Sequence, residues 1–136
     1  MLTSINTLDY RSSAKHKLSF ELLIDGKPIG SVVGSSDTAI PYWLFQTGVA
    51  LSPLNNLESH AEKRVIAVCS CGSYGCSCVQ CNVTQSWDGN ILFRDFTIDQ
   101  YHSDNAFNML MFTFSSVNYD FVVTKIYQEI KALNIT

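Results

Sequence analysis

The stretch from Val65 to Cys81 constrains the fold most strongly, because it carries all five cysteines of the chain and is bounded by apolar segments. Val65–Val68 is a β-branched apolar run, and alternating apolar and polar residues follow Val79, so both segments are typical of strands. Gly72 and Gly75 lie between them and give the backbone the freedom that a tight reversal needs. We therefore expect a β-hairpin at this point.

Two turns define the expected register of this region. If the first hairpin closes between its glycines, the pairs are Cys71 with Cys76, Cys69 with Cys78, Ala67 with Gln80 and Ile66 with Cys81. The second turn is Asp88-Gly89, a strong hairpin signal. Read as a two-residue loop, it pairs Trp87 with Asn90, Val83 with Arg94, Cys81 with Phe96 and Val79 with Ile98.

The two registers agree on which side chains share a face of the resulting three-stranded meander. The expected core face consists of Ile66, Val68, Val79, Cys81, Val83, Leu92, Phe96 and Ile98, with Arg94 reaching past its edge. The other face is mixed and carries Val65, Ala67, Cys69, Cys71, Cys76, Cys78, Gln80, Asn82, Thr84 and Phe93. A slip of one residue in either strand would exchange the two sets.

The N-terminal half gives weaker signals. Residues 1–16 show no clear pattern, whereas Leu18–Ile24 alternates and is followed by an Asp25-Gly26 turn and an expected partner strand over Lys27–Val33. Asp37 is a candidate helix N-cap. The apolar segment 40–45 fits a short helix after Pro41 or a strand, and 49–63 is expected to be a connection with about one helical turn.

The C-terminal part is expected to supply a strand and a helix. Phe107–Phe114 is apolar on both faces, which is typical of a central strand covered on each side. After Ser115-Ser116, apolar residues recur at helical spacing at Tyr119, Val122, Ile126, Ile130 and Leu133. We predict one α+β domain over residues 1–136, with a mostly antiparallel sheet and an amphipathic C-terminal helix on one face.

Composition limits the class of protein. A chain of 136 residues that is 46% hydrophobic can bury a substantial core. We see no apolar run long enough to span a membrane and no signal peptide, so we expect a cytoplasmic protein whose thiols stay reduced. The odd number of cysteines also argues against a closed disulfide framework.

Charge is unevenly distributed. The net charge is −3, but residues 85–124 carry one arginine, Arg94, against five aspartates at 88, 95, 99, 104 and 120. Such a segment disfavours nucleic acid, whose phosphates need cations, and suits a basic protein partner. The simpler interpretation is a solvated acidic face.

The cysteines allow three interpretations. Cys69, Cys71, Cys76 and Cys78 share one face of the expected hairpin and could hold a structural zinc ion, although C-x-C on a flat strand does not converge like the usual C-x2-C turn. They could also be small buried apolar residues, or redox-active thiols. Cys81 is expected to be structural.

No catalytic constellation stands out elsewhere. His16, His60 and His102 are far apart in sequence and lack metal or catalytic spacing, and the chain has neither a G-x-G-x-x-G nor a Walker motif. We therefore expect a protein that is not an enzyme and has no cofactor other than the zinc considered above.

Two motifs carry a resemblance. The segment from Cys69 to Cys76 reads C-x-C-G-x-x-G-C and is followed by Phe93-Arg-Asp-Phe96; both resemble an uncharacterised family of small bacterial proteins, over roughly residues 64–133. Cys78 and Cys81 are additional to that pattern. Small acidic α+β proteins of this kind look like immunity proteins of bacterial toxin systems, including contact-dependent growth inhibition, by analogy of type and charge.

The favoured interpretation is therefore a binding protein that neutralises a basic toxin domain, such as a nuclease. We expect its partner contacts at Trp87, Asp88, Asp95, Asp99, Tyr101, His102 and Asp104. The alternative is a zinc or thiol-redox protein that uses Cys69, Cys71, Cys76 and Cys78. Native mass spectrometry without chelator separates the two, because a stoichiometric zinc lost together with stability would favour the alternative.

Overall fold

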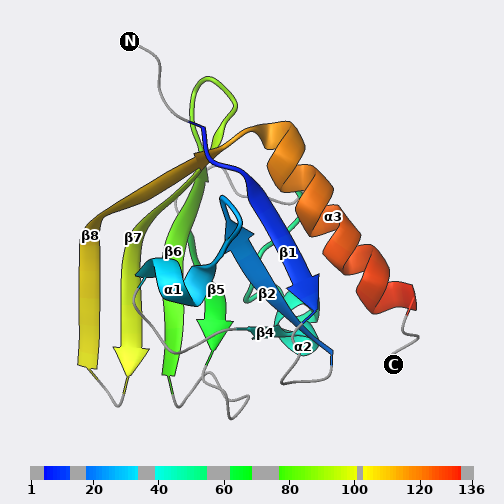
Figure 1. The fold of residues 1–136 in the computed structure, drawn as a ribbon, viewed down its shortest axis with the longest axis horizontal. Coiled ribbons are helices and arrows are strands. Elements are labelled where there is room, and N and C mark those ends of the chain that lie inside the picture. Colours follow the sequence, from blue (N-terminus) through cyan, green and yellow to red (C-terminus); the bar gives the residue numbers. More distant parts are fainter. Residues whose placement is uncertain are drawn as a thin grey trace.

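Two antiparallel sheets and a C-terminal helix form the protein (Figure 1). The structure is a computed structural model, and it describes residues 5–12, 18–33, 39–54, 62–68, 77–100 and 103–132. Each sheet has four strands, and every strand pairing is antiparallel. The α+β class predicted from the sequence is confirmed.

The first sheet is built around β2 (Ser19–Ile24). The whole length of β1 (Leu8–Ser12) pairs with one edge of β2. The other edge of β2 pairs with the short strands β3 (Lys27–Pro28) and β4 (Ile40–Pro41). The sequence predicts β2 but not β1, which lies in the segment without a clear pattern. Leu8 is the only fully buried residue of β1, so its amphipathic signal is weak.

The Asp25-Gly26 turn is confirmed, but the expected strand after it is not. Gly26 has a φ of +83°, and only Lys27 and Pro28 continue the sheet before helix α1 (Ile29–Val33) begins. Pro28 cannot donate a hydrogen bond to a ladder, which favours an early end of the strand. The helix also buries Ile29 completely in the core.

The apolar segment 40–45 contains both of the elements considered for it. Ile40–Pro41 is a strand, and α2 (Tyr42–Gln46) is a short helix that starts directly after Pro41. Gly48, with a φ of +78°, follows the helix end. The proposed N-cap at Asp37 lies outside the described residues, as do residues 55–61 of the predicted 49–63 connection.

The second sheet is a meander in sequence order. Its strands are β5 (Glu62–Val68), β6 (Ser77–Gln85), β7 (Ile91–Gln100) and β8 (Ser103–Phe114). Among the described strands β8 pairs only with β7, so it is the last strand of the sheet, and the prediction that Phe107–Phe114 is central is wrong. An apolar strand at an edge has the same pattern as a central one when another element covers part of it.

The register between β5 and β6 differs from the expected one. Cys81 pairs with Arg64 rather than Ile66, and Cys78 pairs with Val68 rather than Cys69. A register shift between Val65 and Ala67 separates these two parts of the ladder and is a bulge that the sequence does not reveal. Gln80 likewise pairs with Val65 instead of Ala67. The proposed Cys71–Cys76 pair lies outside the described residues.

The register predicted between β6 and β7 is wrong near the turn and correct farther from it. Ser86 rather than Trp87 bonds to Asn90, so the loop has three residues, and Val83 pairs with Phe93 instead of Arg94. A register shift opposite Cys81, which therefore has no direct pair with Phe96, restores the expected pairing of Val79 with Ile98. As a consequence Phe93 is buried and Leu92 is only half-buried.

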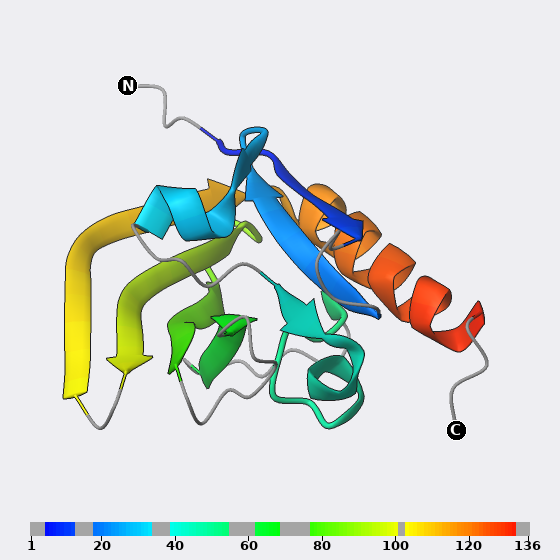
Figure 2. The same ribbon diagram turned by 60° about the horizontal axis from the view of Figure 1, so that its bottom comes forward.

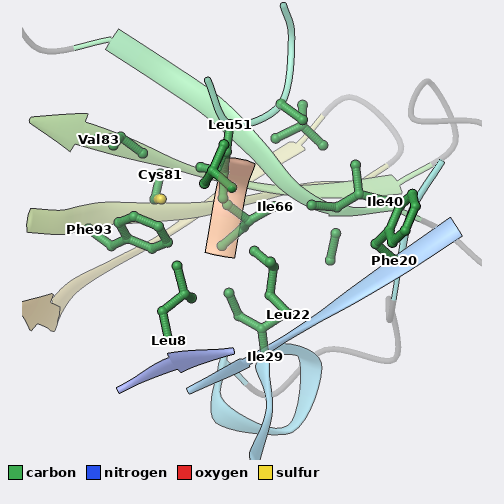
Figure 3. Packing of buried hydrophobic residues seen from close by; sticks show 14 of the residues in the cluster. Leu8, Phe20, Leu22, Ile29, Ile40, Leu51, Ile66, Cys81, Val83 and Phe93 are labelled. Carbon is green, nitrogen blue, oxygen red and sulfur yellow. The ribbon is translucent and has the colours of Figure 1, made fainter. Parts of the chain in front are cut away.

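The two sheets share one hydrophobic core (Figure 3). Side chains from the first sheet and α1 meet side chains from the second: Leu8, Phe20, Leu22 and Ile29 face Ile66, Cys81, Val83 and Phe93. Six of the eight residues assigned to the core face are fully buried, namely Ile66, Val68, Val79, Cys81, Val83 and Phe96. Arg94 is exposed, and the side chain of Ile98 is outside the described part.

Helix α3 (Ser116–Ala132) closes the fold and confirms the predicted amphipathic helix. The Ser115 hydroxyl accepts a hydrogen bond from the Asn118 amide at 3.0 Å. Of the predicted stripe, Tyr119, Val122, Ile126 and Ile130 are buried, and Leu133 lies outside the described residues. The helix lies beside β1, where the Asn118 side chain bonds to both backbone groups of Leu8 at 2.7 and 2.9 Å (Figure 1).

Strands β7 and β8 are strongly bent (Figure 2). The register of β7 shifts against both of its neighbours near Asp95, which has a left-handed φ of 57°. Bulges of this kind bend a strand and increase its twist. Because of the bend, the two halves of β7 run in different directions, which matters for the placement of the predicted contact residues.

Candidate interaction surface

The β6–β7 turn is held by its own backbone. The Ser86 amide donates to the Asn90 carbonyl at 2.8 Å, and the Gly89 amide donates to the Ser86 carbonyl at 2.9 Å. Gly89 has a φ of +91°, a conformation that residues other than glycine adopt only with strain. This is a three-residue hairpin loop with glycine in the left-handed position, the second commonest type of hairpin.

The side chains around the turn reinforce it. The Asp88 carboxylate accepts hydrogen bonds from the Ser86 hydroxyl and from the Asn90 amide at 3.1 Å, and Gln85 Nε2 donates to the Gly89 carbonyl at 3.2 Å. The bond from Ser86, followed by the bond from Asn90, lowers the pKa of Asp88 below its ordinary value. Asp88 is therefore ionised at neutral pH and fixes the shape of the loop.

Trp87 is the residue that this turn presents. It is 98% exposed, more than any other large hydrophobic residue in the described part of the chain. The surrounding hydrogen bonds hold its backbone without burying its side chain. An indole of this size exposed on an ordered loop is typical of a binding anchor rather than of a folding contact.

A second exposed apolar group lies on α3. Val117 and Phe121 are 79% and 62% exposed, and they are one helical turn apart. They line a groove of about 430 Å³ together with Leu54, Ser116, Asp120, Thr124, Lys125 and Gln128. Sequence reasoning missed both residues, although their spacing off the buried stripe of the helix was a usable signal.

Strand register places these two groups at the same end of the sheet. Ile91, at the start of β7, pairs with Phe114, at the end of β8, and α3 begins two residues later. We define the junction surface as Trp87, Asp88, Val117 and Phe121. Lys125 Nζ lies 5.6 Å from the centre of the Phe121 ring, so a cation already occupies one side of that ring.

Asp95 is exposed but engaged. Asn82 Nδ2 donates to its carboxylate at 2.9 Å, and Arg94 Nε lies 4.0 Å from the same oxygen. Both side chains of the ion pair are about half exposed, so the pair contributes little to stability. Asp95 belongs to the middle of the sheet rather than to the junction surface.

The remaining predicted contacts lie toward the other end of β7. Asp99 and Asp104 are register partners next to the β7–β8 connection, while Tyr101 and His102 are outside the described residues. The ten residues of β7, at about 3.3 Å each, separate this end from the turn by roughly 30 Å along the strand. The contacts at Asp99, Tyr101, His102 and Asp104 stay predictions.

The cysteines are also only partly described. Cys78 is buried at the start of β6, where Gln80 Nε2 donates to its sulfur at 3.1 Å, whereas Cys69, Cys71 and Cys76 lie outside the described residues. Burial, and then the charge of Asp95, raises the pKa of the Cys81 thiol, as expected for a structural cysteine. Within the described part no group of three or more His, Cys, Asp and Glu side chains could hold a metal ion. The four-cysteine zinc site stays a prediction.

Comparisons with known proteins add no relative. Neither the protein families, nor the curated proteins, nor the solved structures that were compared with this chain gave a match. Among the helices of the described residues, none has the length and apolar character needed to cross a membrane.

Proposed function

We propose that this protein is a non-enzymatic binding protein of the immunity class, which neutralises a basic toxin domain, such as a nuclease, by direct contact. The observation that carries the proposal is Trp87, which is 98% exposed on a turn held by its own hydrogen bonds. Large aromatic residues dominate the binding energy of protein interfaces.

The rigidity of the turn supports this proposal. Association costs free energy when a loop or side chain must be ordered. In the β6–β7 turn that ordering is already present, because two backbone bonds and the Asp88 carboxylate fix the loop before any partner arrives. The indole then needs only to lose its own rotamer freedom on binding.

Charge favours a basic partner. Asp88 is next to Trp87 and its lowered pKa keeps it ionised, and residues 85–124 carry a net charge of −4 from one arginine and five aspartates. A basic surface would be steered toward the junction surface and would find an ionised carboxylate beside its aromatic anchor. Val117 and Phe121 supply further apolar area at the same end of the sheet.

The other predicted contacts are secondary in this proposal. Asp99 and Asp104 lie at the far end of β7 from Trp87. Tyr101 and His102 lie outside the described residues. We assign first contact to the junction surface, and we keep the far-end residues as contacts for a partner large enough to follow the bent sheet.

The test uses the polypeptide encoded beside this gene, because immunity genes sit beside their toxins. We expect that polypeptide to be basic and toxic, and to bind this protein in isothermal titration calorimetry. Trp87→Ala should weaken the complex by roughly thirtyfold, the size of a hot-spot truncation, while Trp87→Phe should retain most of the affinity.

A matched control is Ile5→Ala, which removes another exposed apolar side chain outside the junction surface. It should leave the affinity unchanged. The immunity assignment fails if the neighbouring polypeptide is harmless in cells or does not bind, and the site assignment fails if Trp87→Ala binds as tightly as the parent protein.

A further inference from the structure

The outer edge of β8 carries a backbone that the fold leaves largely unused. Along its inner edge β8 pairs with β7 over Ser103–Phe107 and over Met111–Phe114, with a register shift between the two parts. On its outer edge, among the described residues, the one backbone contact is at Thr113, where the Asn6 amide donates to the Thr113 carbonyl at 2.7 Å. The Thr113 amide in turn donates to Asn6 Oδ1 at 3.0 Å.

The opposite edge of the same sheet, formed by β5, is contacted by other segments of the chain. Val68 of β5 forms a bridge with Ala39, and the Val65 amide donates to the Val49 carbonyl at 3.1 Å. Segments that precede β5 in the chain thus cover its outer edge. The contrast identifies β8 as the end at which this sheet can accept another strand.

The bonds to Asn6 show which groups are available. Both backbone groups of Thr113 point away from β7, and in an antiparallel ladder this orientation repeats at every second residue. Met111 is therefore the next residue whose N–H and C=O point outward, and its pairing with Arg94 lies in the regular part of the ladder. Its side chain is 57% exposed.

The composition of β8 lacks the usual protection of an edge strand. Exposed edges in natural sheets normally carry lysine, proline or inward-pointing charges, which prevent pairing with another chain. Residues 103–114 contain no proline, lysine or arginine, and Asp104 is their single charged residue. A twelve-residue edge strand of this composition is suited to pairing.

We propose that β8 pairs antiparallel with β8 of a second copy of this chain, so that two four-stranded sheets join into one across a twofold axis. A nearly uncharged edge fits a nearly uncharged strand, and β8 itself is such a strand. A basic partner would gain little here, because the acidic and aromatic groups that suit it lie on the junction surface. Antiparallel pairing of identical strands is also self-complementary, as a twofold interface requires.

Charge placement is compatible with this pairing. The twofold axis falls on the irregular stretch of β8 between Phe107 and Met111, so the Asp104 residues of the two copies lie on opposite sides of the axis and are not opposed. Like charges directly opposite each other would destabilise the ladder. The pairing leaves Trp87 free, since the turn that carries it lies on the other side of β7 from the new strand.

The primary test is the solution mass, measured by sedimentation velocity over a wide range of protein concentrations. The wild-type protein should sediment with twice the mass of one chain at high concentration. Met111→Pro removes one outward-facing donor without touching the bonds to β7, and it should halve the mass while the circular dichroism spectrum stays native. Met111→Glu should have the same effect, because it places a charged side chain on the paired edge.

Amide hydrogen exchange provides a measurement that needs no variant. The Met111 amide should exchange much more slowly at concentrations where the dimer forms than at those where the chain is single, whereas the Thr113 amide, already bonded to Asn6, should change little. Trp87→Ala should leave both the mass and the exchange unchanged, which separates this proposal from the proposed function.

The proposal is overturned if the wild-type chain remains a monomer at every concentration. It is also overturned by a dimer whose Met111 amide is no better protected than that of the monomer. A folded Met111→Glu variant with an unchanged dimer mass would likewise place the interface elsewhere.

Discussion

Two groups of side chains fix loops in this protein, and only one of them is buried. Arg64 is 4% exposed, and its Nη1 donates to the carbonyls of Gly48 and Ala50 and to the Ser52 hydroxyl at 2.8 to 3.1 Å. The hydroxyl of Tyr119 adds a bond to the Ser52 carbonyl at 2.7 Å. The β6–β7 turn uses the same kind of side-chain and backbone bonds, but on the surface.

The difference indicates what each group is for. Bonds around Arg64 tie residues 48–52 to β5 and α3 inside the core, where an unsatisfied polar group is costly, so their loss should appear as lost stability. Bonds around Asp88 are exposed to water and bury nothing, so their loss should appear mainly as a loss of order around Trp87. The buried group serves the fold, and the exposed group is expected to serve recognition.

The largest effect should come from removing the buried guanidinium. Arg64→Met leaves the Gly48 and Ala50 carbonyls and the Ser52 hydroxyl without this donor, and should lower the free energy of unfolding by about 3 kcal/mol. Urea denaturation measures it. Arg94→Met, which changes a half-exposed arginine, should shift stability by no more than about 0.5 kcal/mol. Equal effects for the two variants would remove the distinction between buried and exposed groups.

Alkaline pH should lower the free energy of unfolding, because several tyrosines have raised pKa values in the folded protein. Burial, followed by the hydrogen bond to Glu129, raises the pKa of Tyr10 to about 12, and burial also raises the pKa values of Tyr119 and Tyr127. Since the folded state holds these protons more tightly than the unfolded state, stability should be unaffected below the ordinary tyrosine pKa near 10 and should fall from there toward pH 12.

Denaturation at a series of pH values tests this directly. Tyr10→Phe should reduce the slope between pH 10 and 12, because one of the raised groups is removed. A free energy of unfolding that stayed constant or rose across this interval would contradict the burial of these hydroxyl groups.

A single buried hydroxyl should have a smaller effect. Tyr119→Phe removes the donor to the Ser52 carbonyl while keeping the ring, and should cost about 1.5 kcal/mol in thermal or chemical denaturation. The ring contacts of Tyr119 with Phe93 should persist, so near-ultraviolet circular dichroism of the remaining aromatic residues serves as the control. No loss of stability would mean that water replaces the missing donor.

The exposed turn should respond to a change in its backbone. Gly89→Ala forces a side chain into a φ of +91°, where nothing crowds the new methyl group, so the cost is the backbone strain alone, about 1 kcal/mol. Gly89→Asn should cost less, since asparagine tolerates this conformation better. Affinity for the partner should fall further for alanine than for asparagine. If the two variants bind equally, the shape of the turn is unimportant for binding.

The sequence predicts the elements whose signal is local. The stripe on α3 from Tyr119 to Ile130 is regular over several turns, and the Asp25-Gly26 and Asp88-Gly89 turns are located correctly because they depend on glycine conformation. Burial of Ile66, Cys81 and Phe96 also follows from alternation alone.

The errors arise where a single residue changes the register or where tertiary context decides. A three-residue loop at Trp87–Gly89 instead of a two-residue one moves Phe93 into the core in place of Leu92, and the bulge near Asp95 then corrects the pairing. Neither loop length nor bulge has a strong sequence signal. The edge position of β8 depends on which strand follows in space, which composition does not encode.

The separation of the predicted contacts has the same cause. The seven predicted contact residues are close in sequence, but the ten-residue strand β7 lies between Asp88, in the turn before it, and Asp99, near its end. The exposed apolar pair Val117 and Phe121 belongs to the same end as Trp87 only through the pairing of Ile91 with Phe114. That juxtaposition requires the fold.

The fluorescence of Trp87 itself tests the central claim most directly. The chain has two tryptophans, so Trp43→Phe leaves Trp87 as the sole indole. We predict an emission maximum typical of an indole in water and efficient quenching by iodide for the free protein, followed by a blue shift and protection from quenching when the partner binds. A complex that forms while the emission and the quenching of Trp87 stay as in the free protein would contradict its role as the anchor.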